Sequence, residues 1–325
     1  MRIPFAFWST SVASSPVVSG VSYGVVDLAG GGQRVVVTVN DSTGCTSISA
    51  GAVAFTSFAI DDATHVSGIP GAHAAGVVDV VVTNAVGDSS GGEGLIEYWS
   101  PLQITGVTRY WDSSLGVTSA PAISSWVDQV SADDMAQAVA LKRPELVASV
   151  FGSLPGARFT AGDQFLFGTG ETAFVGYSVF FVVKTVSADT SATEWVNAPL
   201  TVLGGGGWSG FGMSAGNPAT KVYDRAIQVF SPGGANDGAA HIVGLTSDGA
   251  VGAPSKQGYV DGVAVGAPNA SVGTQVDYYN KIGGYNSGDS IIGDIGAIVV
   301  GTGLIFSGSD RLALTEWSRQ RFGVA

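Results

Sequence analysis

The segment YSVFFVV, residues 177–183, consists almost entirely of aromatic and β-branched residues. Such residues favour strands over helices. The run is far shorter than the roughly 20 apolar residues that span a membrane, so it indicates a buried strand. Similar segments recur along the chain and end at turn-forming Gly, Ser, Asn or Asp, and the clearest are RVVVTV (34–39), AVAFTSFAI (52–60) and VVDVVVT (77–83). The pattern predicts an all-β protein.

The composition supports this prediction. Of the 325 residues, 45% are hydrophobic, only 12% are charged and 48 are glycine, whereas Leu, Glu and Lys, which helices use most, are few. A chain of this length exceeds one typical domain, so we expect two domains that each bury a core.

Charge and cysteine content argue against several classes of protein. The formal net charge is −12 and the 14 basic residues are scattered, which argues against binding to nucleic acid or to an anionic membrane. No run approaches 18 apolar residues, so no membrane insertion is expected.

Cys45 is the single cysteine, which leaves no intrachain disulfide, and we interpret it as a small, partly buried hydrophobic residue.

Residues 1–15 are predicted to form an N-terminal arm, because their apolar residues are too few for a core. The arm either adds a strand to its own first domain or makes an assembly contact with a partner, and both interpretations remain open. The apolar stretch is short and Pro4 interrupts it, so we expect no cleaved signal peptide and synthesis in the cytoplasm, with export as the alternative. The residues of the assembly contact are Ile3, Phe5, Phe7 and Trp8.

Residues 16–101 carry an ordered series of strand and turn segments. These are an opening strand (17–21), a glycine turn (30–32), a central strand and turn (58–64), Pro70, the approach AAG (74–76), the strand 77–82, and the closing residues 84–87 and Tyr98. In this order they resemble the IPT/TIG family of immunoglobulin-like domains, although the family's usual Gly-Thr step after the glycine turn is Gln33-Arg34 here. The resemblance implies a β-sandwich that serves as a spacer or binding module and not as an enzyme.

After a predicted linker at residues 102–109, residues 110–325 resemble the concanavalin A-like lectin/glucanase superfamily in its laminin-G-like form, which is common in bacterial and phage surface proteins. The resemblance implies a larger antiparallel jelly roll. The matching segments are YWDSS (110–114), SWVDQ (125–129), KRP (142–144), ARF (157–159), GDQF (162–165), the strands 177–186 and 241–245, the hairpin YVDG (259–262), IGGY (282–285) and GDIGAI (293–298).

One short helix is predicted at the C-terminus. Ser309 is expected to cap its start and Gly323 to end it, while Leu312, Leu314 and Trp317 face the sheet. The predicted fold class is therefore all-β, with an immunoglobulin-like sandwich followed by a jelly-roll sandwich and a C-terminal helix.

No catalytic residues are predicted. Hydrolytic members of the superfamily carry Glu-x-Asp-x-Glu, and none of the six glutamates here has an acidic residue two positions away. No Gly-x-Ser-x-Gly motif accompanies the three histidines, which we interpret as structural. The glutamates are Glu93, Glu97, Glu145, Glu171, Glu194 and Glu316, and the histidines are His65, His73 and His241.

Aromatic residues suggest a glycan site, because pyranose rings present C–H-rich faces to aromatic rings. The Gly-rich stretch 205–210 formally satisfies Gly-x-Gly-x-x-Gly but lacks a βαβ context, and we interpret it as a flexible loop that presents Trp208 and Phe211. The alternative is that Trp208 folds back and packs as a hydrophobic plug. A second cluster combines rings with amides, with strand-end packing as its alternative, and consists of Tyr278, Tyr279, Asn280, Tyr285 and Asn286.

Calcium is a second candidate ligand, because laminin-G-like relatives bind it at the sandwich rim through Asp and carbonyl oxygens. No EF-hand spacing is present, and each Asp is also a plausible turn former. The candidate ligands are Asp163, Asp237, Asp289 and Asp294.

These features predict a bacteriophage virion protein, such as a head or tail decoration or a fibre, whose jelly roll adheres to host-surface polysaccharide. Its partners would be other virion proteins and further copies of itself. A secreted bacterial adhesin or carbohydrate-binding module is the alternative. A polysaccharide-degrading enzyme is a third hypothesis, against which the missing carboxylate pair weighs.

Overall fold

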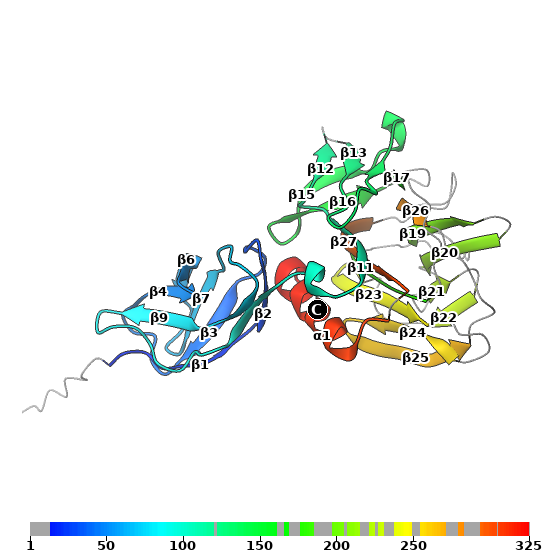
Figure 1. Cartoon of the computed structure of the whole chain (residues 1–325). Helices are drawn as coiled ribbons and strands as arrows, with labels where there is room; N and C mark the ends of the chain where they lie inside the picture. The colour runs from blue at the N-terminus through cyan, green and yellow to red at the C-terminus, as the bar shows by residue number, and fades with distance from the viewer. Residues whose placement is uncertain are drawn as a thin grey trace, which may run out of the picture. The chain divides into compact units, whose positions relative to one another are not determined.

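The computed structural model consists of two compact units, Met1–Tyr98 and Trp99–Ala325, and each is described by itself (Figure 1). Residues 197–204, 207–214, 221–224 and 227–230 are described through their backbone pairing. The residues that the structure describes are 14–119, 122–160, 166–168, 176–184, 197–204, 207–214, 221–224, 227–230, 237–248, 254–270, 279–282, 293–303 and 305–324.

The first unit is built from three small sheets, in which β1, β3, β6 and β7 pair antiparallel, as do β8 with β10 and β4 with β5 and β9. Their strand orders are β1-β3-β7-β6, β2-β10-β8 and β5-β4-β9. The strands are β1 (Val18–Val21), β2 (Val25–Asp27), β3 (Val35–Val39), β4 (Cys45–Ala50), β5 (Val53–Ala54), β6 (Thr56–Ile60), β7 (His65–Ile69), β8 (Gly76–Val78), β9 (Val80–Asn84) and β10 (Ile96–Trp99).

The strand order confirms the predicted immunoglobulin-like sandwich. The order β1-β3-β7-β6 is that of strands A, B, E and D in an immunoglobulin domain, and the pair β4 and β9 corresponds to strands C and F. In β3 the buried residues Val35, Val37 and Val39 alternate with half-exposed ones, as expected for a strand with one face on the core.

Two long predicted strands are each divided in the structure. Residues 52–60 form β5 and β6, which lie in different sheets, and residues 77–83 form most of β8 and β9, which also lie in different sheets. The chain changes sheet at the buried Phe55 and again at Asp79. Each of these continuous apolar segments therefore passes from one sheet to another around the same core.

The second unit contains two larger antiparallel sheets and one α-helix. Its elements are η1 (Pro101–Gln103), β11 (Val107–Asp112), β12 (Val117–Ser119), β13 (Ile123–Trp126), β14 (Met135–Ala136), η2 (Ala140–Lys142), β15 (Glu145–Phe151), β16 (Leu154–Phe159), β17 (Leu166–Gly168), β18 (Tyr177–Lys184), β19 (Asn197–Gly204), β20 (Gly207–Ser214), β21 (Lys221–Asp224), β22 (Ile227–Phe230), β23 (Ala240–Ser247), β24 (Pro254–Val260), β25 (Val263–Ala270), β26 (Tyr279–Ile282), β27 (Gly293–Thr302) and α1 (Gly308–Phe322).

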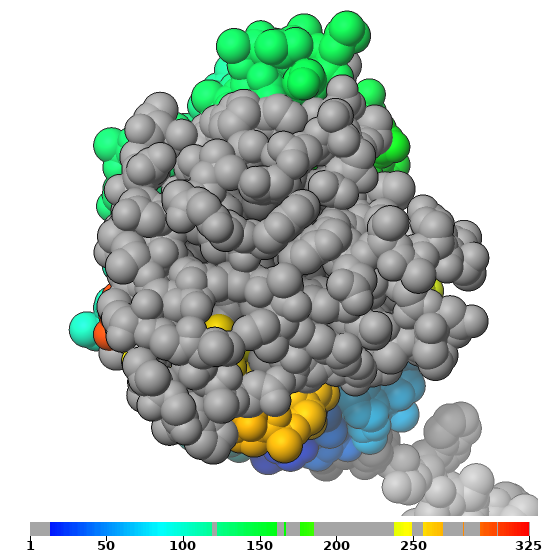
Figure 2. Space-filling model, turned by 90° about the vertical axis from the view of Figure 1, so that its right-hand side faces the viewer, coloured from blue at the N-terminus to red at the C-terminus, as the bar shows by residue number. Residues whose placement is uncertain are grey.

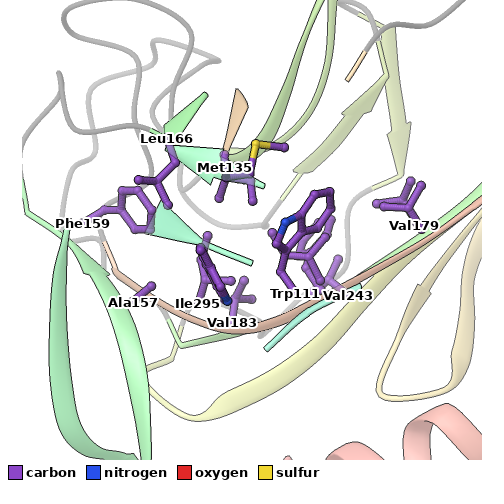
Figure 3. Packing of buried hydrophobic residues seen from close by; sticks show 14 of the residues in the cluster. Trp111, Met135, Ala157, Phe159, Leu166, Val179, Val183, Val243 and Ile295 are labelled. Atoms are coloured by element: carbon purple, nitrogen blue, oxygen red, sulfur yellow. The ribbon is translucent and has the colours of Figure 1, made fainter. Parts of the chain in front are cut away.

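The eight-stranded sheet has the order β15-β16-β27-β18-β23-β24-β25, with β11 also paired to β27. The nine-stranded sheet has the order β12-β13-β14-β17-β26-β19-β20-β21-β22. One hydrophobic core lies between them: Figure 3 shows Met135 and Leu166 of the nine-stranded sheet above Trp111, Val183 and Ile295 of the eight-stranded sheet. The sandwich predicted for this part of the chain is confirmed.

The eight-stranded sheet is buried on both faces, which explains why its central strand β18 has no polar alternation. Alternate residues such as Val179 and Phe181 face the core between the sheets. On the other face Phe180 stacks on Phe306, with ring centroids 5.9 Å apart. Seven of the eight β18 residues are buried as a result.

A glycine makes this second aromatic layer possible. Gly244 of β23 is the register partner of Phe180, and a Cβ at Gly244 would lie 2.1 Å from the Phe180 ring. No real side chain tolerates such a contact, so the ring occupies the space that the glycine leaves.

Helix α1 covers this side of the sheet. Its N-cap is Ser307, whose hydroxyl accepts a hydrogen bond from the Asp310 N–H, so the predicted cap at Ser309 was wrong by two residues. The reciprocal bond from Ser307 N–H to the Asp310 carboxylate completes a capping box, which selects Ser307. Gly323 ends the helix in the left-handed conformation, as predicted.

Two further predictions about this region are corrected. Leu314 and Trp317 are buried, but Leu312 is 61% exposed, because it lies on the opposite side of the helix.

Residues 102–109, predicted to be a linker, lie within the second unit: they include part of η1, the buried Ile104 and the start of β11, which pairs with β27.

A buried ion pair joins α1 to β11. The Arg321 Nε lies 2.9 Å from Asp112 Oδ2, and the side chains are 2% and 0% exposed. The Tyr110 hydroxyl donates to the same oxygen, and the Ser114 hydroxyl accepts from Arg321 while donating to Asp112 Oδ1. The network therefore satisfies both charges inside the protein.

Replacing Arg321 by Ala should lower the free energy of unfolding by about 3–5 kcal/mol, because Asp112 would keep an uncompensated buried charge. Urea denaturation followed by tryptophan fluorescence measures this, since six of the seven tryptophans lie beyond residue 98. The control is Arg319→Ala, whose ion pair with Glu316 is partly exposed and should be worth less than about 1 kcal/mol. Equal losses of unfolding free energy in both variants would contradict the conclusion that Asp112 and Arg321 form a buried ion pair.

Replacing Gly244 by Ala should destabilise the second unit by about 1–3 kcal/mol, because the added methyl group overlaps the Phe180 ring. The matched control is Gly308→Ala at the start of α1, where the nearest atom to a Cβ is 3.9 Å away and Ala favours the helix. Thermal unfolding of both variants should separate them, and a tolerated Gly244→Ala would refute the packing argument.

Candidate functional site

Several predicted site residues lie outside the described residues. The glycan candidates among them are Tyr278, Tyr285 and Asn286; the calcium candidates are Asp163 and Asp289; and the assembly contact is Ile3, Phe5, Phe7 and Trp8. They stay predictions.

Trp208 and Phe211 lie in strand β20, so the prediction that they sit on a flexible loop was wrong. β20 pairs with β19 on one side and with β21 on the other. Glycine is disfavoured in strands in isolation, and here the pairing on both sides overrides that preference.

The strand register separates the two aromatic residues. Phe211 pairs with Leu200, Leu200 with Ile282, and Ile282 with Leu166. Directly paired residues share a face of a sheet, and Leu166 and Ile282 belong to the core between the sheets. The backbone register therefore assigns the position of Phe211 to the core side of the sheet.

Trp208 is on the other face of the nine-stranded sheet, which we call the outer face. Trp208 precedes Phe211 by three residues, and the pairing of β20 with β19 has no register shift between these two positions. Residues an odd number apart in a regular strand lie on opposite faces of the sheet. Its register partner in β19 is Leu203.

A row of paired residues crosses seven strands on the outer face. Where the structure describes their side chains, Thr118 and Ala136 are exposed, while the neighbouring Trp126 and Met135 are in the core. This alternation shows which face of the sheet is open to solvent in strands β12 to β14. The row consists of Thr118, Ser125, Ala136, Phe167, Lys281, Thr201 and Gly210.

Tyr279 and Asn280 lie in β26, between β17 and β19. Tyr279 pairs with Val202, and the register shifts between this pair and the pair of Thr201 with Lys281. β26 is thus a central strand that carries two of the predicted glycan residues within two positions of the outer-face row.

The two calcium candidates that the structure describes form ion pairs with basic side chains. Asp294 receives two hydrogen bonds from Arg158, at 2.8 and 2.9 Å. Asp237 Oδ1 lies 3.0 Å from Nε2 of His241. In the described part of the chain, no group of three or more His, Cys, Asp or Glu side chains is arranged to hold a metal ion.

His241 forms a cluster that the sequence did not reveal. Its Nδ1 lies 2.8 Å from Asp261 Oδ2, so the imidazole lies between the carboxylates of Asp261 and Asp237. The side chain of His241 is 8% exposed.

The hydrogen bond to Asp261, together with the weaker effect of Asp237, raises the pKa of His241 to about 8 despite burial. The hydrogen bond from His241 in turn lowers the pKa of Asp237.

The turn that holds Asp261 was predicted from the Asp-Gly sequence. Asp261 and Gly262 have φ angles of 49° and 82°, which a two-residue type I′ hairpin between β24 and β25 requires. Figure 2 shows residues of β24 and β25, in orange, at the bottom of the second unit, and residues from its first strands, in green, at the top. Since both ring nitrogens of His241 are engaged, the cluster acts as a clamp between β23 and the hairpin and offers no nitrogen for general base catalysis.

Other carboxylates of the second unit also serve structural roles. Asp128 and Asp133 both pair with Arg109, and Asp128 accepts hydrogen bonds from the backbone N–H groups of Tyr110 and Val130. No helix in the described part of the chain is long and apolar enough to cross a membrane.

Comparisons with known proteins concern the fold. A scan of protein-family models and a search of curated sequences found no match. The sialidase of Trypanosoma rangeli in complex with sialic acid matches over 88% of this chain and 42% of its own, with a TM-score of 0.50 and 13% identity. Domain 4 of AbnA, a GH43 extracellular arabinanase from Geobacillus stearothermophilus in complex with arabinotriose, matches over 66% of this chain and 100% of its own, with a TM-score of 0.40 and 12% identity.

The chain thus spans less than half the length of the sialidase that it matches. At 13% identity this likeness shows the fold alone, and the score for the arabinanase domain is too low to support an argument. The likeness agrees with a β-sandwich architecture for the chain.

The His241 clamp should make the second unit less stable at alkaline pH. The pKa of His241 is about 8 in the folded state and about 6.5 when unfolded, so its contribution is complete below pH 6.5 and is lost as the pH rises through 8. The free energy of unfolding should fall by up to about 2 kcal/mol between pH 6 and pH 9. In His241→Gln this fall should be absent. If the free energy of unfolding of that variant depended on pH as it does in the wild type, the role of His241 as a clamp would be refuted.

Proposed function

We propose that this chain is a non-enzymatic surface protein of a bacteriophage virion whose second unit adheres to glycan on the host surface. The second unit supplies adhesion, and the first unit serves as an IPT/TIG-like spacer that attaches to the particle. Residues 1–15 dock on a neighbouring virion protein or on another copy of the chain. The protein is made in the host cytoplasm and acts on the virion surface.

The position of Trp208 carries the proposal of glycan adhesion. Every Trp, Tyr and Phe of the second unit whose side chain the structure describes is buried in a core. Trp208 has a register position on the outer face of the nine-stranded sheet. An aromatic side chain on that face would provide the flat apolar surface on which sugar rings stack.

Two further observations support a binding role over an enzymatic one. The sequence lacks the paired acidic motif of the hydrolytic relatives, and the described carboxylates discussed above are held in ion pairs or turns. The sialidase with the similar fold was solved with sialic acid, and we extend glycan binding, but not hydrolysis, to this chain. Fold alone does not define a site, so Trp208 is the residue to test.

Replacing Trp208 by Ala should reduce binding of the purified chain to host-envelope polysaccharide by about tenfold or more, because the stacking surface is lost. Biolayer interferometry on immobilised polysaccharide measures the affinity, and circular dichroism verifies the fold. The control is Thr118→Ala, an exposed outer-face position in β12 at the far edge of the same sheet. Unchanged binding by Trp208→Ala would refute adhesion through this face.

The virion assignment has a separate test. Mass spectrometry of purified particles should detect the chain with its N-terminus intact. Recovery only from the medium, with residues 1–15 removed, would support the secreted adhesin or carbohydrate-binding module instead. Polysaccharide cleavage that is lost on changing one Asp of the second unit would support the enzyme.

A further inference from the structure

We propose that a rigid loop of the second unit, residues 138–143, binds the acidic segment 58–62 of a second copy of this chain, so that copies associate head to tail. This inference rests on the docking between copies that the proposed function includes, and it names two surfaces for it. The side chains of both segments are described, and each segment carries exposed apolar residues beside charges of one sign.

The 138–143 loop exposes a run of apolar residues. Ala138 and Ala140 are exposed, Val139 is 51% exposed and Leu141 is 90% exposed. Leu141 is the most exposed large hydrophobic residue in the described part of the chain. Single apolar residues on a surface are ordinary, whereas a contiguous exposed group of them marks a contact surface.

Hydrogen bonds hold this loop in place. Nε and Nη2 of Arg143 donate to the carbonyl oxygens of Gln137 and Ala138, at 2.7 and 3.1 Å. The Val139 N–H donates to the side-chain oxygen of Gln137, and the Gln137 N–H donates to the carbonyl oxygen of Ser124 in β13. Because the loop is ordered before a partner arrives, binding has little conformational entropy to remove from it.

Lys142 and Arg143 give the loop a positive end. They are the one pair of adjacent basic residues in the sequence, and both are partly exposed. Glu145, the nearest acidic residue along the chain, is the register partner of Arg158 in β16, so its charge lies beside a cation of its own sheet. The loop therefore joins an apolar run to positive charge, and its complement is a surface with apolar and acidic groups.

The first unit carries a surface of this kind at the end of β6. Ile60 is 49% exposed, and Asp61 and Asp62 follow it directly and are exposed. The sequence contains two pairs of adjacent acidic residues, and this is the exposed pair, since residues 133–134 are partly buried. An exposed apolar residue next to two carboxylates matches Leu141 next to two basic residues.

Asp62 stays ionised at neutral pH. Hydrogen bonds from the Thr64 N–H and the His65 ring lower the pKa of Asp62 to about 2, and its side chain is 58% exposed. Asp61 is joined through one serine hydroxyl to Arg34, so His65 and Arg34 are cations close to this segment. Two exposed carboxylates lie beside these partners, and they make the segment complementary to a basic loop.

The two surfaces are different, so one copy can offer its loop to a second copy while its own acidic segment receives a third. A contact of this kind is heterologous, and repetition of it produces rings or filaments. The contact is small, and a dissociation constant of about 10–100 µM is expected for a single contact.

Sedimentation velocity of the full-length chain tests the association. The mean sedimentation coefficient should rise between about 1 and 500 µM, and the rise should weaken at high salt because exposed ion pairs are screened. Leu141→Glu and Asp62→Lys should each weaken association by about tenfold or more. The matched controls are Leu312→Glu, at another exposed leucine, and Asp88→Lys, at another exposed aspartate, and neither should change it.

Mixing tests whether two copies supply the two surfaces. Leu141→Glu retains the acidic segment and Asp62→Lys retains the loop, so each variant alone should stay monomeric at about 100 µM while an equimolar mixture forms a heterodimer. In a chain that combines Lys142→Asp with Asp62→Lys, the exchanged charges should restore part of the association that either change removes. Circular dichroism verifies the fold of each variant.

The outcomes distinguish this inference from the proposed function. A wild-type chain that is monomeric at every concentration, or a mixture that forms no heterodimer, overturns the head-to-tail contact and leaves glycan adhesion and virion incorporation to the tests given above. Association that survives both Leu141→Glu and Asp62→Lys, or that Leu312→Glu weakens equally, also overturns it. If the chain associates as expected but is absent from purified particles, this contact stands and the virion assignment is wrong.

Discussion

The ion pair between Asp112 and Arg321 connects parts of the second unit that are 209 residues apart in sequence. Neither charge reaches water, and a buried charge without its partner is strongly destabilising, so α1 has to lie where Arg321 meets β11. The indole of Trp126 donates to the backbone oxygen of Asp112 and extends the network into the nine-stranded sheet. Asp112 thus joins the helix to both sheets, through its carboxylate to Arg321 and through its backbone oxygen to Trp126.

The position of α1 explains the rest of the architecture. With the helix on one face and the nine-stranded sheet on the other, the eight-stranded sheet is the middle of three layers and its strands are apolar on both faces. Close approach of the aromatic layer beneath α1 depends on Gly244, which leaves room for Phe180.

Local features of the fold could be predicted well from the sequence. The Asp261-Gly262 hairpin and the Gly323 helix end were predicted because their backbone conformations require these residue types nearly independently of context. The helix cap was misplaced because Ser307 and Ser309 are equally good caps in isolation, and the side chain of Asp310 selects Ser307. The expected loop around Trp208 is a strand because pairing with β19 and β21 outweighs the low strand preference of glycine.

The sequence by itself determined the strand-forming segments, the turns and the terminal helix, since these follow from the preferences of residues close together in the chain. Only the tertiary structure decided that Phe211 is on the core face and Trp208 on the outer face, that Asp112 pairs with Arg321, and that His241 lies between Asp237 and Asp261. Each depends on which distant segments lie side by side. A shift of one residue in strand register would exchange the two faces, and no local pattern in a Gly-rich strand specifies that register.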